Sequence, residues 1–257
     1  MSRTRQVARV VELLVLALLA LGRVAMGATT VALNTGYDNG SFAPYPPASQ
    51  PSTTNDNYWI TIASFPNLPV APAWVLKYPG LPWAPAIAST NWIGPRNTVS
   101  SAPITAGQPN YAIFRKCFCL LPNYKNPSLT FQVLTDDASQ AWFNSQLNVA
   151  LPPSPANYGG PPRQSLASSA SWFHQGTNCI YLLLEDVGGW TGFDLAGTIQ
   201  ADGLDPLPAT GANITFRCPC NAGVPTKFND EQVVTALRKI AEERRLKRTV
   251  PPGRRPN

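Results

Sequence analysis

The stretch Thr177-Asn-Cys-Ile-Tyr-Leu-Leu-Leu184 decides the fold class of this chain. Its last five residues are apolar at every position, which is typical of a β-strand that is covered on both faces. A second run, Ser128–Thr135, instead places Leu129, Phe131 and Val133 on one face, so this strand is expected to bury mainly one side. These two patterns predict a core built from β-strands.

Shorter runs of the same kind recur along the chain between turn residues. They cover Thr30–Asn34, Tyr58–Phe65, Ala73–Lys77, Tyr111–Leu120, Ala141–Phe143, Ser171–His174, Thr191–Ala201 and Asn213–Cys218. The links 44–55 and 152–162 are rich in Pro, Gly and Asn, which excludes helices there. No strand–helix–strand alternation is present, which excludes α/β nucleotide-binding folds. The sequence therefore predicts an all-β fold, an antiparallel β-sandwich of the jelly-roll type over residues 29–205, with a Cys-containing strand and linker over 206–226.

The composition supports a folded domain with few charges. Only 13% of the 257 residues are charged, about half the share of an ordinary soluble domain. Seven Trp and an aromatic content of 10% supply enough apolar surface to exclude a disordered chain. The body over residues 29–226 holds seven basic and nine acidic residues, so the net charge of +6 arises at the two ends. We therefore expect no nucleic-acid partner.

The N-terminal segment has the order of a secretory signal peptide. Three arginines within the first nine residues precede the apolar run 13–21, and small residues follow at Ala25 and Gly27. We assign the signal-peptide segment to residues 1–28. Cleavage after Gly27, with Ala25 at the −3 position, fits best, because cleavage after Ala28 would place the larger Met26 there. The alternative is an uncleaved anchor, although the run is shorter than the roughly 20 residues that span a bilayer. A secreted, extracellular protein is expected.

The C-terminal segment 227–257 is predicted to form a basic amphipathic helix and a tail. Asn229 can cap a helix that begins near Asp230, and the basic residues Arg244 and Arg245 suit its last turn. An apolar stripe follows one face. The stripe fits a helix packed on the sandwich or frayed in solvent, and it also fits a helix that contacts an anionic surface such as lipid or acidic polysaccharide.

Cys117, Cys119, Cys179, Cys218 and Cys220 are the disulfide candidates of an exported chain. Because residues i and i+2 of a strand share a face, each of the two Cys-x-Cys pairs can face a common neighbour. The connectivity stays open, and the odd number leaves one thiol free or pairs it between chains, so the oligomeric state is also open. Zinc binding is disfavoured because zinc sites usually space their cysteines further apart.

Six short motifs, in order, resemble the galactose-binding-domain-like jelly rolls of bacterial surface and secreted proteins, including the sugar-binding domain of β-galactosidases. They are Asn34-Thr-Gly36, Trp92-Ile-Gly-Pro95, Phe114-Arg-Lys-Cys-Phe118, Thr135-Asp-Asp137 with Phe143-Asn144, Gly176-Thr-Asn-Cys-Ile-Tyr-Leu182 and Gly188-Gly-Trp-Thr-Gly192. The resemblance covers roughly residues 30–202. It implies a jelly-roll fold and a carbohydrate ligand.

The candidate ligand-binding residues are one aromatic side chain and four polar ones. Trp190 lies between glycines in a loop and suits the apolar face of a sugar ring, unless it packs as a lid over the end of the sandwich. Asp136, Asp137, Asn144 and Asp186 are the candidate polar contacts. Asp136 and Asp137 are also possible Ca²⁺ ligands, or they form a turn in which carboxylates accept backbone amides. In a strand, these two neighbours would point in opposite directions.

No catalytic motif is present. The single histidine, His174, has no nucleophile motif to serve. A glycoside-acting enzyme stays a minor alternative, whose two carboxylates would come from Asp136, Asp137, Glu185, Asp186 and Asp194. Asn39 and Asn213 match the N-glycosylation pattern and are candidate surface acceptors. We therefore expect a secreted, non-enzymatic module without a cofactor, other than calcium, that binds a glycan or another cell-surface or matrix component. The alternative is a structural matrix or envelope protein that assembles through disulfides without a small ligand.

Overall fold

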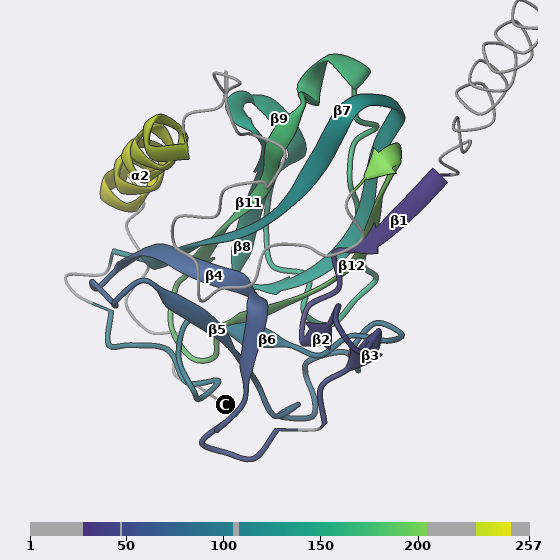
Figure 1. Cartoon of the computed structure of the whole chain (residues 1–257). Helices are drawn as coiled ribbons and strands as arrows, with labels where there is room; N and C mark the ends of the chain where they lie inside the picture. The colour runs from purple at the N-terminus through teal and green to yellow at the C-terminus, as the bar shows by residue number, and fades with distance from the viewer. Residues whose placement is uncertain (1–27, 47, 105–107, 205–229, 248–257) are drawn as a thin grey trace, which may run out of the picture.

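The computed structural model describes residues 28–46, 48–104, 108–204 and 230–247 (Figure 1). The strands are β1 (Ala28–Ala32), β2 (Tyr37–Asp38), β3 (Ala43–Pro44), β4 (Asn55–Phe65), β5 (Ala71–Val75), β6 (Ile93–Gly94), β7 (Asn110–Asp136), β8 (Ala138–Phe143), β9 (Ser145–Ser154), β10 (Arg163–Gln164), β11 (Gly176–Asp186) and β12 (Gly192–Leu204). A short 3₁₀ helix, η1 (Ala170–Trp172), and the α-helix α2 (Asp230–Lys247) complete the described elements. The expected all-β class with a C-terminal helix is confirmed.

The long strand β7 organises the two layers of the sandwich (Figure 1). Its first part pairs antiparallel with β11 and β4, and β11 continues through β8 to β9. Its second part pairs antiparallel with β12, which carries β1 on its other side. The two-residue strand β6 joins β12 to β5. The sandwich is therefore closed along one side, in the manner of a barrel.

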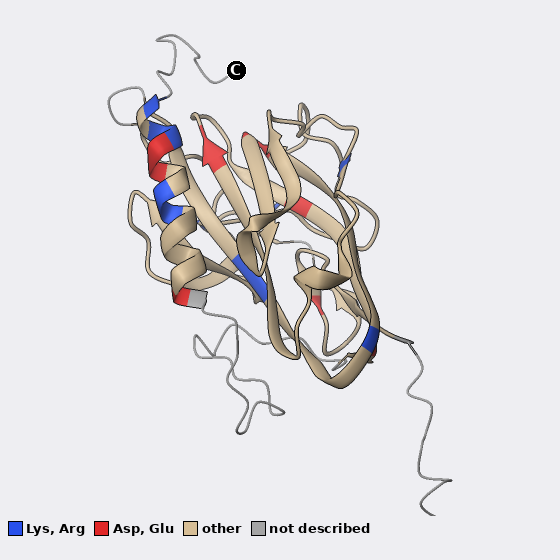
Figure 2. Ribbon diagram, turned by 90° about the horizontal axis from the view of Figure 1, so that it is seen from above, with Lys and Arg blue, Asp and Glu red and all other residues tan. Residues whose placement is uncertain are grey.

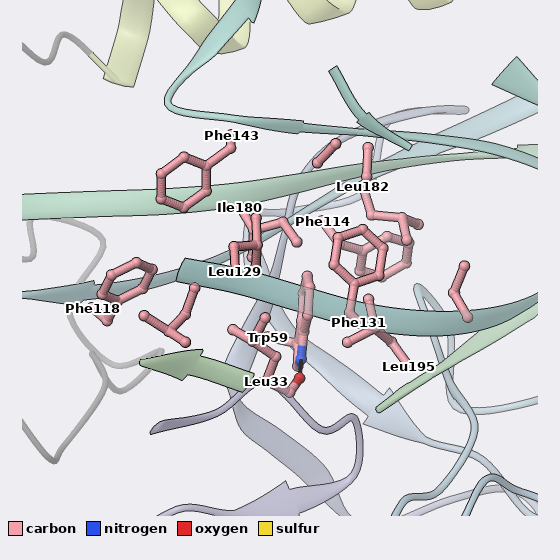
Figure 3. Close-up of a cluster of buried hydrophobic side chains, with 14 of the residues drawn as sticks. Leu33, Trp59, Phe114, Phe118, Leu129, Phe131, Phe143, Ile180, Leu182 and Leu195 are labelled. Carbon is pink, nitrogen blue, oxygen red and sulfur yellow. Dashed lines mark hydrogen bonds between the residues drawn. The ribbon is translucent and has the colours of Figure 1, made fainter. Parts of the chain in front are cut away.

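The main core lies between these layers. Large buried side chains from both parts of β7 meet those of β4, β11 and β12 there; Figure 3 labels Leu33, Trp59, Phe114, Phe118, Leu129, Phe131, Phe143, Ile180, Leu182 and Leu195. The Trp59 indole N–H donates a 2.9 Å hydrogen bond to the Leu33 carbonyl, which satisfies the one polar atom of this side chain. The predicted inward face of Ser128–Thr135, with Leu129, Phe131 and Val133, is confirmed.

Helix α2 covers the outer face of β4, β7 and β11. Val233, Leu237 and Ala241 pack against outward-facing residues of these strands, such as Tyr181 and Leu183. The apolar stripe of the helix is therefore buried on the protein itself. Because one face of β11 meets the main core and the other meets α2, every residue of this strand is buried. The cover on both faces that is predicted for its apolar run 180–184 is therefore confirmed.

Basic side chains hold α2 against the sheet. Charged residues are concentrated on this helix and are sparse over the strands (Figure 2). Arg244 Nη1 lies 3.3 Å from the Glu185 carboxylate. Arg238 donates a hydrogen bond to the Ile62 carbonyl, and the Arg245 guanidinium lies 4.0 Å from the centre of the Phe65 ring. Arg244 and Arg245, the basic residues predicted for the last turn, therefore help to hold α2 against the sheet.

Cys117 and Cys179 form a disulfide between the paired strands β7 and β11. Cys119 is disulfide-bonded as well. Cys218 and Cys220 lie outside the described residues, as do Asn213 and the predicted strand and linker over 206–226. Residues 1–27 of the predicted signal peptide also lie outside them, whereas Ala28 belongs to β1 and pairs with Asp202. Within the described part of the chain, no helix is long and apolar enough to cross a membrane.

Some predicted elements are wrong. Ser171–His174 is not a strand, because the Ser169 side chain accepts a hydrogen bond from the Ser171 N–H and starts the 3₁₀ turn η1. The two runs Tyr111–Leu120 and Ser128–Thr135 belong to one continuous strand, β7. Strand β9 is not predicted, since most of its residues are exposed or half-buried and its apolar positions do not alternate regularly.

Candidate functional site

Three aspartates gather where β7 and β11 end side by side. Asp136 is the last residue of β7, Asp137 follows it, and Asp186 is the last residue of β11. The backbone N–H of Asp137 donates to the Glu185 carbonyl, which holds the turn after β7 against β11. All three side chains are at least nine-tenths buried.

The Asp136 and Asp137 carboxyl groups do not point in opposite directions. A side-chain hydrogen bond joins them, because the chain leaves β7 at Asp136 and is no longer a regular strand at Asp137. The peptide bond between the two residues is cis. The side-chain hydrogen bond holds the two carboxyl groups at one location.

Each carboxyl group also accepts hydrogen bonds from its surroundings. The indole N–H of Trp83 donates to Asp136 at 2.7 Å, and the backbone N–H of Val187 donates to Asp137 at 2.6 Å. Asp186 accepts from the Ser101 hydroxyl at 2.6 Å and from the N–H of Gly188 two residues ahead, which is the turn geometry expected of an aspartate.

Burial, followed by the charge of the neighbouring Asp137 carboxylate, raises the pKa of Asp136 to about 8. Burial also raises the pKa of Asp186. Asp136 therefore holds a proton at neutral pH and can donate it to Asp137. Two carboxyls in direct hydrogen-bond contact are closer than the roughly 5–10 Å at which glycosidase pairs work.

Asp136 and Asp137 are predicted, as one alternative, to be ligands of a Ca²⁺ ion. Two carboxylates can contribute to an oxygen-only cation site. Across the described ranges of the chain, however, no group of three or more Asp, Glu, His or Cys side chains has an arrangement suited to a metal ion. In this structure each of these carboxyl groups accepts at least one hydrogen bond from a protein donor.

An open pocket of about 650 Å³ lies directly beside Asp137. It is lined by Asp137, Ala138 and Val187 and by the segment 153–160. The segment is rich in Pro and Gly and contributes one aromatic residue, Tyr158. The pocket thus combines a carboxylate with apolar carbon and an aromatic ring.

The pocket wall is held firmly by Asn157. Its side chain accepts from the Thr135 N–H and donates to the Val133 carbonyl, each at 2.9 Å, which ties the segment to the end of β7. The Tyr158 carbonyl accepts from the N–H of Ala84. The sequence does not predict this wall, because the composition of 152–162 indicates only a link. The one signal for it is an aromatic residue among turn formers, in Asn157-Tyr-Gly-Gly160.

Trp190 does not line the pocket. It is half-buried and packs edge-on against Trp83 with ring centroids 6.1 Å apart, and Trp83 in turn stacks on Trp92 at 4.0 Å. Trp190 therefore packs as a lid over an aromatic cluster. This is the role stated above as the alternative to sugar binding for this residue. Trp83 connects this cluster to the aspartates through its bond to Asp136.

Asn144 lies at the opposite end of β8 from Asp137 and is not part of the site. Its side chain donates to Asn178 at 2.8 Å and accepts from the Cys179 N–H at 2.7 Å. These bonds are structural: they hold a left-handed turn with φ of 58° between β8 and β9. The prediction that Asn144 contacts a ligand together with Asp137 is therefore not supported by this geometry.

Asn39 is not a surface acceptor for a glycan. It is only 1% exposed, and its carboxamide hydrogen-bonds to the Ala32 carbonyl and to the Lys116 ammonium. The sequence pattern Asn39-Gly-Ser41 is present, but burial keeps this side chain from a glycosylating enzyme.

Comparisons of this chain with protein-family models, with curated proteins and with solved structures gave no match.

Proposed function

We propose that this chain is an exported, non-enzymatic module that binds a carbohydrate in the pocket beside Asp137. The observation that carries the proposal is the open pocket of about 650 Å³, which is formed by loops at one end of the sandwich. Loops carried by a rigid scaffold are where binding residues concentrate. The resemblance of the motifs to sugar-binding jelly rolls points to the same class of ligand.

The chemistry of the walls suits a sugar. Sugar hydroxyls hydrogen-bond to carboxylates and backbone groups, and the carbon-bearing faces of a sugar ring favour aromatic and proline surfaces. Asp137 supplies the carboxylate, and Tyr158 and the prolines 153 and 155 supply the apolar surface. Because Asn157 fixes the wall in advance, little ordering is needed on binding.

Export is supported by the N-terminal sequence and by the chemistry of the cysteines. Disulfides persist in oxidising compartments, and the Cys117–Cys179 bond fits such a location. In the sequence, the three early arginines followed by the apolar run 13–21 favour a signal peptide.

A glycan array followed by titration calorimetry tests the proposal. We expect Tyr158→Ala and Asp137→Asn each to weaken binding at least tenfold. Asp202→Asn, the same change at the far end of β12, is expected to leave affinity unchanged. Repeating the titration with Ca²⁺ and with a chelator separates direct sugar contact from contact through a cation. Absence of binding to every glycan, or equal affinity of all variants, would reject the proposal.

The competing hypothesis is a structural protein joined through intermolecular disulfides. The Cys117–Cys179 bond lies within one chain and so does not join copies. Electrophoresis of the native protein without reductant distinguishes the two hypotheses: a ladder of covalent oligomers favours the structural protein, and a monomer band favours the binding module.

A further inference from the structure

A lysine in the first part of β7 is completely buried, faces a carboxamide and interacts electrostatically with a buried carboxyl group. Lys116 is 1% exposed, and its Nζ donates a 2.9 Å hydrogen bond to Oδ1 of Asn39, which is also 1% exposed. Asp56, from β4, is 0% exposed and interacts electrostatically with Lys116. Tyr58 places its ring 5.5 Å from the same Nζ.

Burial opposes charge on both the amine and the acid. It lowers the pKa of Lys116 to about 8, and it raises the pKa of Asp56 against the opposing effect of Lys116. Transfer of a proton from the ammonium to the carboxylate would leave a neutral amine and a neutral carboxylic acid. The amine would then be a nucleophile at physiological pH.

The geometry presents that amine to the Asn39 carboxamide. Because a C=O bond is about 1.23 Å long, the Asn39 Cγ lies within about 4 Å of Nζ, close to the separation of a near-attack conformer. The Asn39 amide nitrogen is held on the other side by its 2.9 Å bond to the Ala32 carbonyl. The carbonyl end of the carboxamide therefore faces the lysine.

We propose that Lys116 and Asn39 join in a spontaneous intramolecular isopeptide bond, with Asp56 as the proton carrier. From the neutral amine and the neutral acid, the Nζ lone pair attacks Cγ of Asn39, and the Asp56 carboxyl group donates its proton to Nδ2. The Cγ–Nδ2 bond then breaks, ammonia leaves, and the Asp56 carboxylate takes one proton from Nζ, which restores the acid. The products are one Nζ–Cγ amide and one ammonia, so no oxidant, cofactor or second molecule is needed.

Asp56 is held firmly for this role. One of its oxygens accepts from the Gly36 N–H at 2.7 Å, and the other accepts from the backbone N–H groups of Tyr58 and Trp59. A carboxyl group held in this way needs little reorganisation when it gives up or accepts a proton. The bond would tie the segment between β2 and β3 to β7 across 77 positions of sequence. This inference does not depend on carbohydrate binding.

Peptide mass mapping of the reduced wild-type protein tests the proposal directly. Trypsin cuts after Arg115, Lys77 and Lys125, so an isopeptide bond predicts one branched product that contains Asn39 and the peptide Lys116–Lys125. Its mass should be lower than the sum of the two peptides by one ammonia, and cleavage after Lys116 should be lost. Separate linear peptides, with cleavage after Lys116, would overturn the proposal.

Substitutions then show what each of the three residues contributes to the bond. Asn39→Ala and Lys116→Met should abolish the branched product, and Asp56→Asn should reduce its yield at least tenfold. Asn57→Ala changes an exposed asparagine in the same tryptic peptide as Asn39 and should leave the product intact. Full yield in the Asp56→Asn variant would remove Asp56 from the mechanism. Because the wild-type map needs no variant, poor folding of any substitution leaves the test decisive.

Discussion

Trp83 donates its indole N–H to the Asp136 carboxyl group at 2.7 Å, across 53 positions of sequence. This bond joins the aromatic cluster at the end of the sandwich to the aspartates beside the pocket. Trp83 is 0% exposed, so its N–H has no access to water. The same indole stacks on Trp92 and meets the edge of Trp190. The position of the pocket wall at Asp137 therefore depends on a tryptophan far away in sequence.

Trp83→Phe keeps an aromatic ring in the cluster but removes the donor to Asp136. We expect the free energy of unfolding to fall by about 1–3 kcal/mol, the cost of leaving a buried polar group without its partner. Chemical denaturation measures this change. Trp190→Phe is the matched control: it leaves the Trp83–Asp136 bond in place, so its loss should be clearly smaller. Equal losses in the two variants would show that the bond contributes nothing measurable.

The raised pKa of Asp136 predicts a pH dependence of stability. Its pKa is about 8 in the folded protein and 3.8 in a model compound, so between these values the folded state binds more protons than the unfolded state. Stability should therefore fall as the pH rises from about 4 to about 8 and level off above it.

Asp136→Asn isolates this contribution. An asparagine can accept from Trp83 and donate to Asp137 as the protonated acid does, without losing a proton at high pH. The variant should have a flatter stability profile and unfold at higher denaturant concentration than the wild type above about pH 8. Asp202→Asn should leave the profile unchanged. A variant profile as steep as that of the wild type would assign the pH dependence elsewhere.

Helix α2 is expected to be part of the folded unit. Leu237 is 0% exposed and packs on the outer face of the sheet, whereas Leu246 on the same helix is 60% exposed. Leu237→Ala should lower the free energy of unfolding by about 2–5 kcal/mol, because it leaves a cavity in a close-packed interface. Leu246→Ala should change it by no more than about 0.5 kcal/mol. Denaturation curves compare the two, and similar midpoints would mean that the helix is not docked in solution.

The sequence predicts those elements whose burial follows from a local pattern of apolar residues. The apolar run 180–184 matches the cover of β11, which meets the main core on one face and α2 on the other. The alternation at 129, 131 and 133 matches the face that this part of β7 turns to the main core. The predicted C-terminal helix is also confirmed as α2, because its apolar stripe and charge signals are local, whereas Asn229, its predicted cap, lies outside the described residues.

The site was harder to predict because it depends on contacts between distant segments. Asp136, Asp137 and Asp186 were candidates from sequence, and the fold does bring them together. Their partner Trp83 and the wall at Tyr158 come from Pro-rich segments that have no periodicity. Asn39 and Asn144 were misjudged because an exposed asparagine and a buried one that caps a turn have the same local sequence signals.

A substitution at Gly197 in β12 tests whether β12 and β7 pair in the register that the structure shows. It lies opposite Phe131, and a β-carbon added at Gly197 would come within 2.4 Å of the Phe131 Cβ and 2.5 Å of the Thr130 carbonyl oxygen. Both atoms belong to a paired strand that cannot give way cheaply, so Gly197→Ala should destabilise the fold by about 1–3 kcal/mol. At Gly159, in the pocket wall, the nearest atom to an added β-carbon is 3.4 Å away, and Gly159→Ala should cost clearly less. Thermal or chemical unfolding ranks the two variants, and a Gly197→Ala protein as stable as the wild type would mean that β12 and β7 are not paired in this register.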